Sequence, residues 1–153
     1  MAKRTVVKIG DQMLRLKSKA VVNFDESLWQ LLDDMKETMN AENGVGIAAV
    51  QVAVLRRACI VFADDEYIEF INPVIISSSG NQFIQEGCLS VPDTHGEVDR
   101  PKKITVKAYD RFGKPFACKM SGYKAIVCCH EFDHLDGVLF TDKMKKNKDK
   151  EGN

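Results

Sequence analysis

Hydrophobic residues recur at helical spacing in two segments of the chain. The first segment predicts a helix that begins near Asp25, whose side chain can cap the first turn, and ends at Asn43. Its apolar stripe, interpreted as a core face, comprises Leu28, Leu32, Met35 and Met39. The second segment predicts a helix from about Ser121, a candidate cap, to Asp136, with Gly137 as the stop signal.

Between these helices, runs rich in Ile, Val and Phe predict β-strands. The predicted strands cover residues 57–63, 67–76, 82–89, 103–109 and 116–120. The second strand contains Asn72 and Pro73, so we expect it to be bulged or to lie at a sheet edge. The last two flank a turn with glycine and proline, which predicts a hairpin. No internal repeat or linker divides the chain, which favours a single α+β domain.

The composition is typical of one globular domain, with 153 residues, 44% of them hydrophobic and 29% charged. The 22 basic and 22 acidic residues balance, so overall charge gives no reason to expect binding to nucleic acid or to an anionic membrane. The amino terminus lacks an apolar run of signal-peptide length, and we expect a cytoplasmic location. The folded domain is expected over residues 1–142. The lysine-rich polar tail, residues 143–153, is a candidate contact to the ribosome or RNA.

Residues 130–134, within the second predicted helix, read H-E-F-D-H. Histidines four residues apart lie on one face of a helix, so His130 and His134 can bind one metal ion. Glu131 between them can act as a general base on a water at that metal. This pattern indicates a metal-dependent hydrolase. The alternative is a solvated helix with two unrelated histidines.

A catalytic metal site needs a third protein ligand, and no histidine follows His134. The best candidate is Cys88, which lies between Gly87 and a turn near the end of a predicted strand. A buried, unreactive thiol is the alternative interpretation of Cys88. The chain has five cysteines, an odd number without a C-x-x-C pair, so a disulfide framework is not expected.

Three segments together resemble the motifs of peptide deformylases. Residues 44–51 read G-V-G-I-A-A-V-Q and resemble the family motif G-Φ-G-Φ-A-A-x-Q, in which Φ is apolar. Residues 86–90 read E-G-C-L-S and resemble E-G-C-x-S, and residues 130–134 resemble H-E-x-D-H. Each motif alone is a weak or moderate signal. Their order and spacing match the family over nearly the whole chain.

The resemblance implies an enzyme that removes the formyl group from the N-terminal formyl-methionine of nascent polypeptides and releases formate. It implies a compact α+β domain in which antiparallel sheets surround the helix that carries H-E-x-D-H. The implied metal ligands are Cys88, His130 and His134. Glu131 is the implied acid and base, while the side chain of Gln51 and the backbone N–H of Leu89 face the scissile carbonyl oxygen. Without the other motifs, the preferred interpretation of Gln51 is a polar residue in an apolar loop that is hydrogen-bonded to the backbone.

The resemblance also implies ferrous iron as the metal in vivo, with zinc, nickel or cobalt as alternatives. A thiolate with two imidazoles suits any of these borderline-soft ions. Neither a membrane nor DNA is an expected partner. The expected partners are formyl-methionyl peptides and, through the tail, the ribosome.

The substrate pocket is expected to be formed by residues that flank the motifs. The candidates are Val45, Gly46, Ile84, Glu86, Ile126 and Val127. Gly46 and its neighbours are expected to bind the peptide as an added strand, and Glu86 can orient a metal ligand. The apolar candidates are equally explained as core. Where many relatives carry an arginine after the second motif, this chain has His95, interpreted as a surface turn residue or a weak substrate contact.

Three other classes of function compete with this reading. A common H-E-x-x-H endopeptidase lacks its downstream ligand here. A thiol hydrolase with Cys88 as nucleophile would leave Glu131 and the histidine spacing unexplained. A structural zinc in a non-catalytic binding module normally needs four protein ligands, and three are evident.

Overall fold

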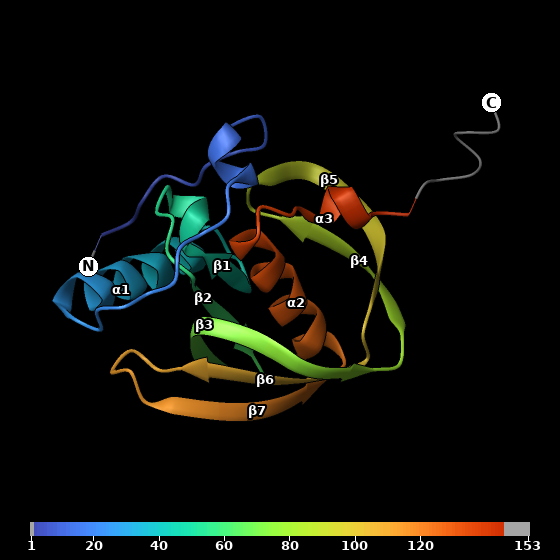
Figure 1. Cartoon of the computed structure of the whole chain (residues 1–153). Helices are drawn as coiled ribbons and strands as arrows, with labels where there is room; N and C mark the ends of the chain where they lie inside the picture. The colour runs from blue at the N-terminus through green and yellow to red at the C-terminus, as the bar shows by residue number, and fades with distance from the viewer. Residues whose placement is uncertain (1, 146–153) are drawn as a thin grey trace.

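A central helix lies between two antiparallel sheets in a computed structural model that describes residues 2–145 (Figure 1). The larger sheet has the strand order β1-β2-β3-β6-β7. Its strands are β1 (Gly46–Ala48), β2 (Ala58–Ala63), β3 (Glu66–Ser79), β6 (Lys103–Tyr109) and β7 (Pro115–Ser121). The smaller sheet pairs β4 (Gln82–Cys88) with β5 (Val91–Arg100). The helices are α1 (Glu26–Ala41), α2 (Tyr123–Leu135) and α3 (Phe140–Lys143), with 3-10 turns η1 (Gln12–Arg15) and η2 (Ala49–Val52).

Helix α1 forms where the sequence predicts it. The Asp25 side chain accepts a hydrogen bond from the N–H of Leu28, which satisfies one of the free donors of the first turn. The predicted apolar stripe is fully buried against Ile47 and Ile60 of the larger sheet. Each such buried side chain contributes about 1.5–3 kcal/mol. The helix ends before Asn43, which has a positive φ of 57°.

Helix α2 covers the opposite face of the larger sheet. Along β2, Cys59 and Val61 pack in the cluster that contains α2, while the alternate residues Ala58 and Ile60 pack with α1. The predicted cap at Ser121 is wrong, because Ser121 is still paired with β6 as the last residue of β7. Gly122, at φ 65°, makes the turn into the helix instead.

The remaining strands confirm most of the predicted sheet. The bulge predicted near Pro73 is present as a register shift between Ile71 and Val74, but β3 lies between β2 and β6 and is not an edge. Strand β5 was not predicted, because Pro92 and Gly96 suggested a turn. It forms because its backbone pairs with β4, and Gly96 leaves room for the side chain of Met144.

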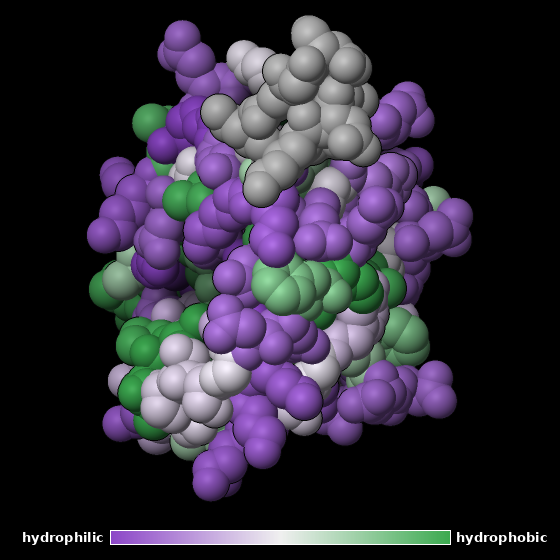
Figure 2. All heavy atoms as spheres, turned by 90° about the vertical axis from the view of Figure 1, so that its right-hand side faces the viewer, coloured by the Kyte–Doolittle hydropathy of each residue, from purple (hydrophilic) through white to green (hydrophobic). Residues whose placement is uncertain are grey.

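The start of the predicted tail packs on the smaller sheet. Lys143 ends α3, Met144 forms a bridge with Val98 of β5, and the N–H of Lys145 donates to the carbonyl of Glu97. The rest of the predicted tail, residues 146–153, lies outside the described residues. Viewed from this side, the surface shows mostly hydrophilic side chains with smaller hydrophobic areas between them (Figure 2). Every helix within residues 2–145 is too short or too polar to cross a membrane.

Candidate active site

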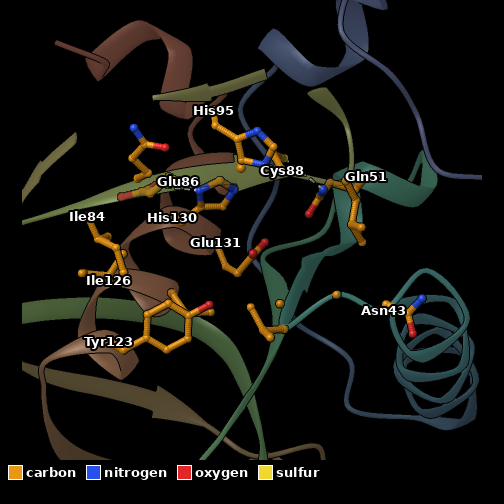
Figure 3. A pocket seen from close by; sticks show the side chains of 17 residues that line it. Asn43, Gln51, Ile84, Glu86, Cys88, His95, Tyr123, Ile126, His130 and Glu131 are labelled. Atoms are coloured by element: carbon orange, nitrogen blue, oxygen red, sulfur yellow. Dashed lines mark hydrogen bonds and ion pairs between the residues drawn. The ribbon is translucent and has the colours of Figure 1, made fainter. Parts of the chain in front are cut away.

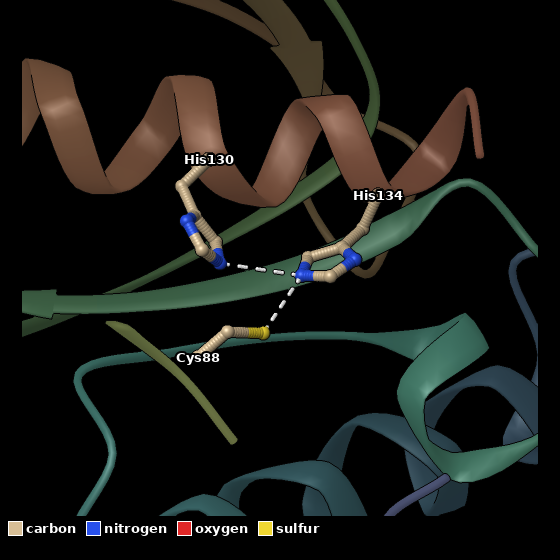
Figure 4. Close-up of side chains that lie close together, drawn as sticks. All are labelled: Cys88, His130 and His134. Atoms are coloured by element: carbon tan, nitrogen blue, oxygen red, sulfur yellow. Dashed lines mark hydrogen bonds between the residues drawn. The ribbon is translucent and has the colours of Figure 1, made fainter. Parts of the chain in front are cut away.

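Helix α2 and the end of β4 bring three metal-binding side chains together (Figure 4). The Nε2 atom of His134 lies 3.3 Å from the Nε2 atom of His130 and 3.3 Å from the Sγ atom of Cys88. All three donor atoms lie within 4.8 Å of one another. A thiol and two imidazoles directed at one point fit a divalent metal with three protein ligands and a position left for water.

Burial and charge set the protonation of the two histidines. Burial, with smaller effects from His130 and Arg100, lowers the pKa of His134 well below its usual value, so its imidazole is neutral as a metal ligand requires. Burial also disfavours protonation of His130, but hydrogen bonds with Cys88 and Glu86 raise its pKa to about 10. A metal therefore has to displace a proton from His130 when it binds.

A buried ion pair orients His130. Its Nδ1 atom lies 2.9 Å from Glu86 Oε1, and Glu86 in turn accepts two hydrogen bonds from Arg100, at 2.8 and 2.9 Å. Burial raises the pKa of Glu86, but these bonds lower it more, so Glu86 stays a carboxylate. Arg100 also donates to Asp133 at 2.6 Å, which ties the smaller sheet to α2. Glu86 therefore fixes the ring that presents Nε2 to the metal position.

Sequence reasoning did not assign a role to Arg100. Its burial becomes visible only once β5 is placed, where the alternate residues Gly96, Val98 and Arg100 are buried. An arginine on the buried face of a strand requires an anionic partner.

Glu131 projects into the same site from α2. Its side chain is buried, and its Oε1 atom is without a hydrogen-bond partner among the described residues. Burial raises its pKa to about 7, against a smaller opposing effect of His130. A β-carbon added to Gly46 would lie 2.5 Å from Glu131 Oε2, so the glycine is what gives the carboxylate its space.

Gln51 and Leu89 lie beside Cys88. The Gln51 amide donates to Ser90 Oγ at 3.1 Å, and its oxygen accepts from the N–H of Ala48 at 2.9 Å. Both bonds fix the orientation of the amide, whose nitrogen is 3.6 Å from Cys88 Sγ. Leu89 follows Cys88 in the turn between β4 and β5 and lines the same pocket.

The amino-terminal segment holds these two parts of the site together. The N–H of Val7 donates to the carbonyl of Gln51 and the N–H of Ile9 to the carbonyl of Ser90, both at 2.7 Å. Lys8 Nζ donates to the carbonyl of Leu89 at 3.1 Å. Residues 7–9 therefore tie η2, which carries Gln51, to the turn that carries Leu89.

A cavity of about 370 Å³ opens beside these groups (Figure 3). All six predicted pocket residues line it: Val45, Gly46, Ile84, Glu86, Ile126 and Val127. Tyr123 also lines the cavity and was not predicted for this role. Tyr123 shares the helical spacing of Ile126, Val127 and His130 on α2, which would have indicated it. His95 lies in β5 rather than in the predicted turn, and it also lines the cavity.

Comparison with known proteins places these features in one family. A sequence model of the polypeptide deformylase family matches residues 3–150. The chain is 51% identical to a peptide deformylase of Caldicellulosiruptor bescii over 144 residues, which cover 94% of this chain and 87% of the relative.

Solved structures of peptide deformylases share the fold. The enzyme from Legionella pneumophila superimposes with a TM-score of 0.91 at 44% identity, covering 94% of this chain and 87% of that one. A class I type b enzyme from Acinetobacter baumannii, bound to Met-Ala-Ser, gives a TM-score of 0.90 at 34% identity, covering 93% of this chain and 98% of that one.

Proposed function

Because the chain belongs to the polypeptide deformylase family, we propose that it performs the family reaction in the cavity beside Cys88, His130 and His134. Enzymes of this family remove the formyl group from nascent polypeptides. The observation that carries the proposal is the convergence of three metal-binding atoms within 4.8 Å, with the carboxylate of Glu131 lining the same cavity.

The three convergent residues are proposed to hold one divalent ion. When bound, such an ion supplies an acidified water and an electrophilic partner for the formyl oxygen. Ferrous iron is the proposed ion in vivo, and zinc, nickel and cobalt suit the same thiolate and imidazole donors. Metal analysis of protein purified without air, beside the activity of each reloaded form, tests this choice.

Glu131 is proposed as the acid and base of the reaction. Its raised pKa of about 7 allows its carboxylate to take a proton from the attacking water and return that proton to the departing amine. The oxyanion that forms at the formyl oxygen when water adds to the formyl carbon needs donors that are fixed in advance. The Gln51 amide and the Leu89 N–H are proposed for this role, and loss of one such donor costs about 10²–10³-fold in rate.

The peptide is proposed to bind as an extended strand between β1 and β4. Each of these strands has one edge paired within its own sheet, and both contribute to the cavity wall. The methionine side chain would then contact Ile84, Tyr123 and Ile126. The Acinetobacter relative bound to Met-Ala-Ser supports a pocket of this specificity. His95 is positioned at the same cavity to contact the residues that follow methionine.

A cytoplasmic location and contact with the ribosome complete the proposal. They are supported by the bacterial relatives, whose family acts on nascent polypeptides. The tail residues 146–153, expected to mediate the contact, lie outside the described residues.

Formate release from formyl-Met-Ala-Ser tests the proposed site. The wild-type protein and Glu131→Gln are compared after loading with the same metal, and Glu97→Gln, an exposed carboxylate of β5, serves as a matched control. We expect Glu131→Gln to lose about 10²–10⁴-fold in kcat with unchanged metal content, as for other general acid–base groups. The control should retain wild-type activity. Full activity in Glu131→Gln would contradict the assigned role.

A further inference from the structure

Positive charge is concentrated in the hairpin of β6 and β7. Residues 101–124 contain seven basic residues and one acidic residue, in a chain whose basic and acidic totals are equal. Arg111 is paired with Asp33 and Glu69. Within residues 2–145, lysine ion pairs are formed only by Lys3, Lys143 and Lys145, so the six lysines of residues 101–124 form none. These are Lys102, Lys103, Lys107, Lys114, Lys119 and Lys124.

Three of these lysines share one face of the larger sheet. Residues directly opposite in antiparallel strands point to the same side. Ser79, Lys103 and Ser121 form one such row across β3, β6 and β7. The next rows are Ser77–Thr105–Lys119 and Val74–Lys107–Ala117. The nine positions therefore offer three ammonium groups and four hydroxyls, and no carboxylate.

The part of this face that carries the three rows has no helix packed on it among the described residues. Ile104 and Val106, the alternate residues of β6, pack with α2 on the other side of the sheet. Helix α1 covers the far end of the sheet, at β1 and β2. In Figure 1, β7 forms the lower edge of the molecule. The lysines of the three rows are exposed, and a hollow of about 380 Å³ lies over the first two rows.

The arrangement of the lysines fits a linear polyanion. Lys103, Lys119 and Lys107 occupy consecutive rows, which lie about 7 Å apart along the strands. Cations at this interval can meet successive phosphates of an extended strand, and neighbouring hydroxyls can donate to phosphate oxygens. Because nascent polypeptides are made on RNA-rich particles, RNA is the polyanion that the substrate chemistry favours.

We infer that the outer face of the β6–β7 hairpin is a docking surface for the phosphate backbone of RNA. The surface lies near the entrance of the active site. Ser121 lines both the hollow on this face and a second hollow, and that second hollow shares Val45 and Tyr123 with the active-site cavity. An enzyme held by the hairpin would therefore keep the cavity close to the RNA-bearing particle. None of the three lysines lines the cavity, so docking and catalysis can be measured separately.

The test is the binding of a labelled 20-nucleotide single-stranded RNA, followed by fluorescence anisotropy. Three phosphate contacts predict that a fourfold rise in salt weakens binding about 20-fold. The triple variant Lys103→Glu, Lys107→Glu, Lys119→Glu should raise Kd at least about 10-fold. A matched control, Lys17→Glu, Lys19→Glu, Lys36→Glu, changes the net charge equally but leaves the hairpin intact, and it should bind nearly as wild type.

Formate release from formyl-Met-Ala-Ser checks the fold of each variant and should be unchanged in both. If the triple glutamate variant releases no formate, the triple variant with Lys→Gln at the same three positions replaces it. Its Kd for RNA is then compared with that of the wild type in the same way. Equal weakening in the hairpin variant and the control would overturn the inference, as would the absence of RNA binding by the wild type. Competition by poly-glutamate as effective as by RNA would overturn it too, since the partner would then be an acidic protein. If the wild type releases no formate, the proposed reaction is contradicted, but the proposed RNA docking is not.

Discussion

Replacing Arg100 by methionine tests whether the buried ion pairs stabilise both the fold and the metal site. The methionine keeps much of the aliphatic stem but removes the guanidinium, which is 2% exposed and binds Glu86 and Asp133. Removing one partner of a buried pair costs about 3–5 kcal/mol, because the other charge remains buried. Asp133 keeps Lys143 at 3.2 Å and is 19% exposed, so most of the cost falls on Glu86. We therefore expect the free energy of unfolding to fall by about 3 kcal/mol, the lower end of this range.

A domain of this size loses about 2–4 °C in Tm per kcal/mol, so Arg100→Met should melt about 6–12 °C below the wild type. The assay is thermal unfolding followed by circular dichroism. The control is Arg15→Met, which breaks an exposed pair with Asp142 and should cost less than about 1 kcal/mol. Arg100→Met should also bind metal about 10–100-fold more weakly, because Glu86 no longer holds His130 in place. Equal melting temperatures for Arg100→Met and Arg15→Met would refute the reasoning.

Two further predictions concern a glycine of the site and a buried acid of α1. Gly46→Ala should lower kcat about 100-fold with little change in Tm, because the added β-carbon displaces the Glu131 carboxylate. The kinetics of Gly46→Ala in a Glu131→Gln background check this, since there the glycine substitution should lower kcat no further. Burial alone would raise the pKa of Asp34. Hydrogen bonds from the Ala2 N–H, Arg4 and Gln30 have the larger combined effect and lower the pKa below its usual 3.8. The ionised Asp34 should therefore stabilise the fold above about pH 4, and this contribution should be lost as the pH falls through the lowered pKa. In urea unfolding, the free energy of unfolding of Asp34→Asn should not show this loss at acid pH. If the free energy of unfolding of Asp34→Asn falls at acid pH as much as that of the wild type, this assignment is contradicted.

Local sequence signals predicted the elements whose cause is local. Asp25 caps α1 through its own side chain, and the alternation of Ile104 and Val106 gives β6 its buried face. Strand β5 was missed because its cause is tertiary, since residues 96–100 pair with β4 and Gly96 leaves room for Met144. Pattern alone cannot reveal such a partner.

For the candidate site, the sequence predicted three possible ligands that the structure brings together, Cys88, His130 and His134. They lie in short motifs whose spacing follows the geometry of a helix and suits the chemistry of a metal. The groups that position them were not predicted. Arg100 and the segment around Val7 reach the site through long-range contacts that no local pattern encodes.

X-ray absorption of the metal-loaded enzyme tests the central claim most directly. The proposed site predicts one sulfur ligand at about 2.3 Å and nitrogen ligands from two imidazoles at about 2.0 Å. In Cys88→Ala the sulfur signal should disappear together with formate release, while the protein remains folded. A wild-type spectrum without sulfur, or formate release that persists after complete removal of metal, would contradict the account.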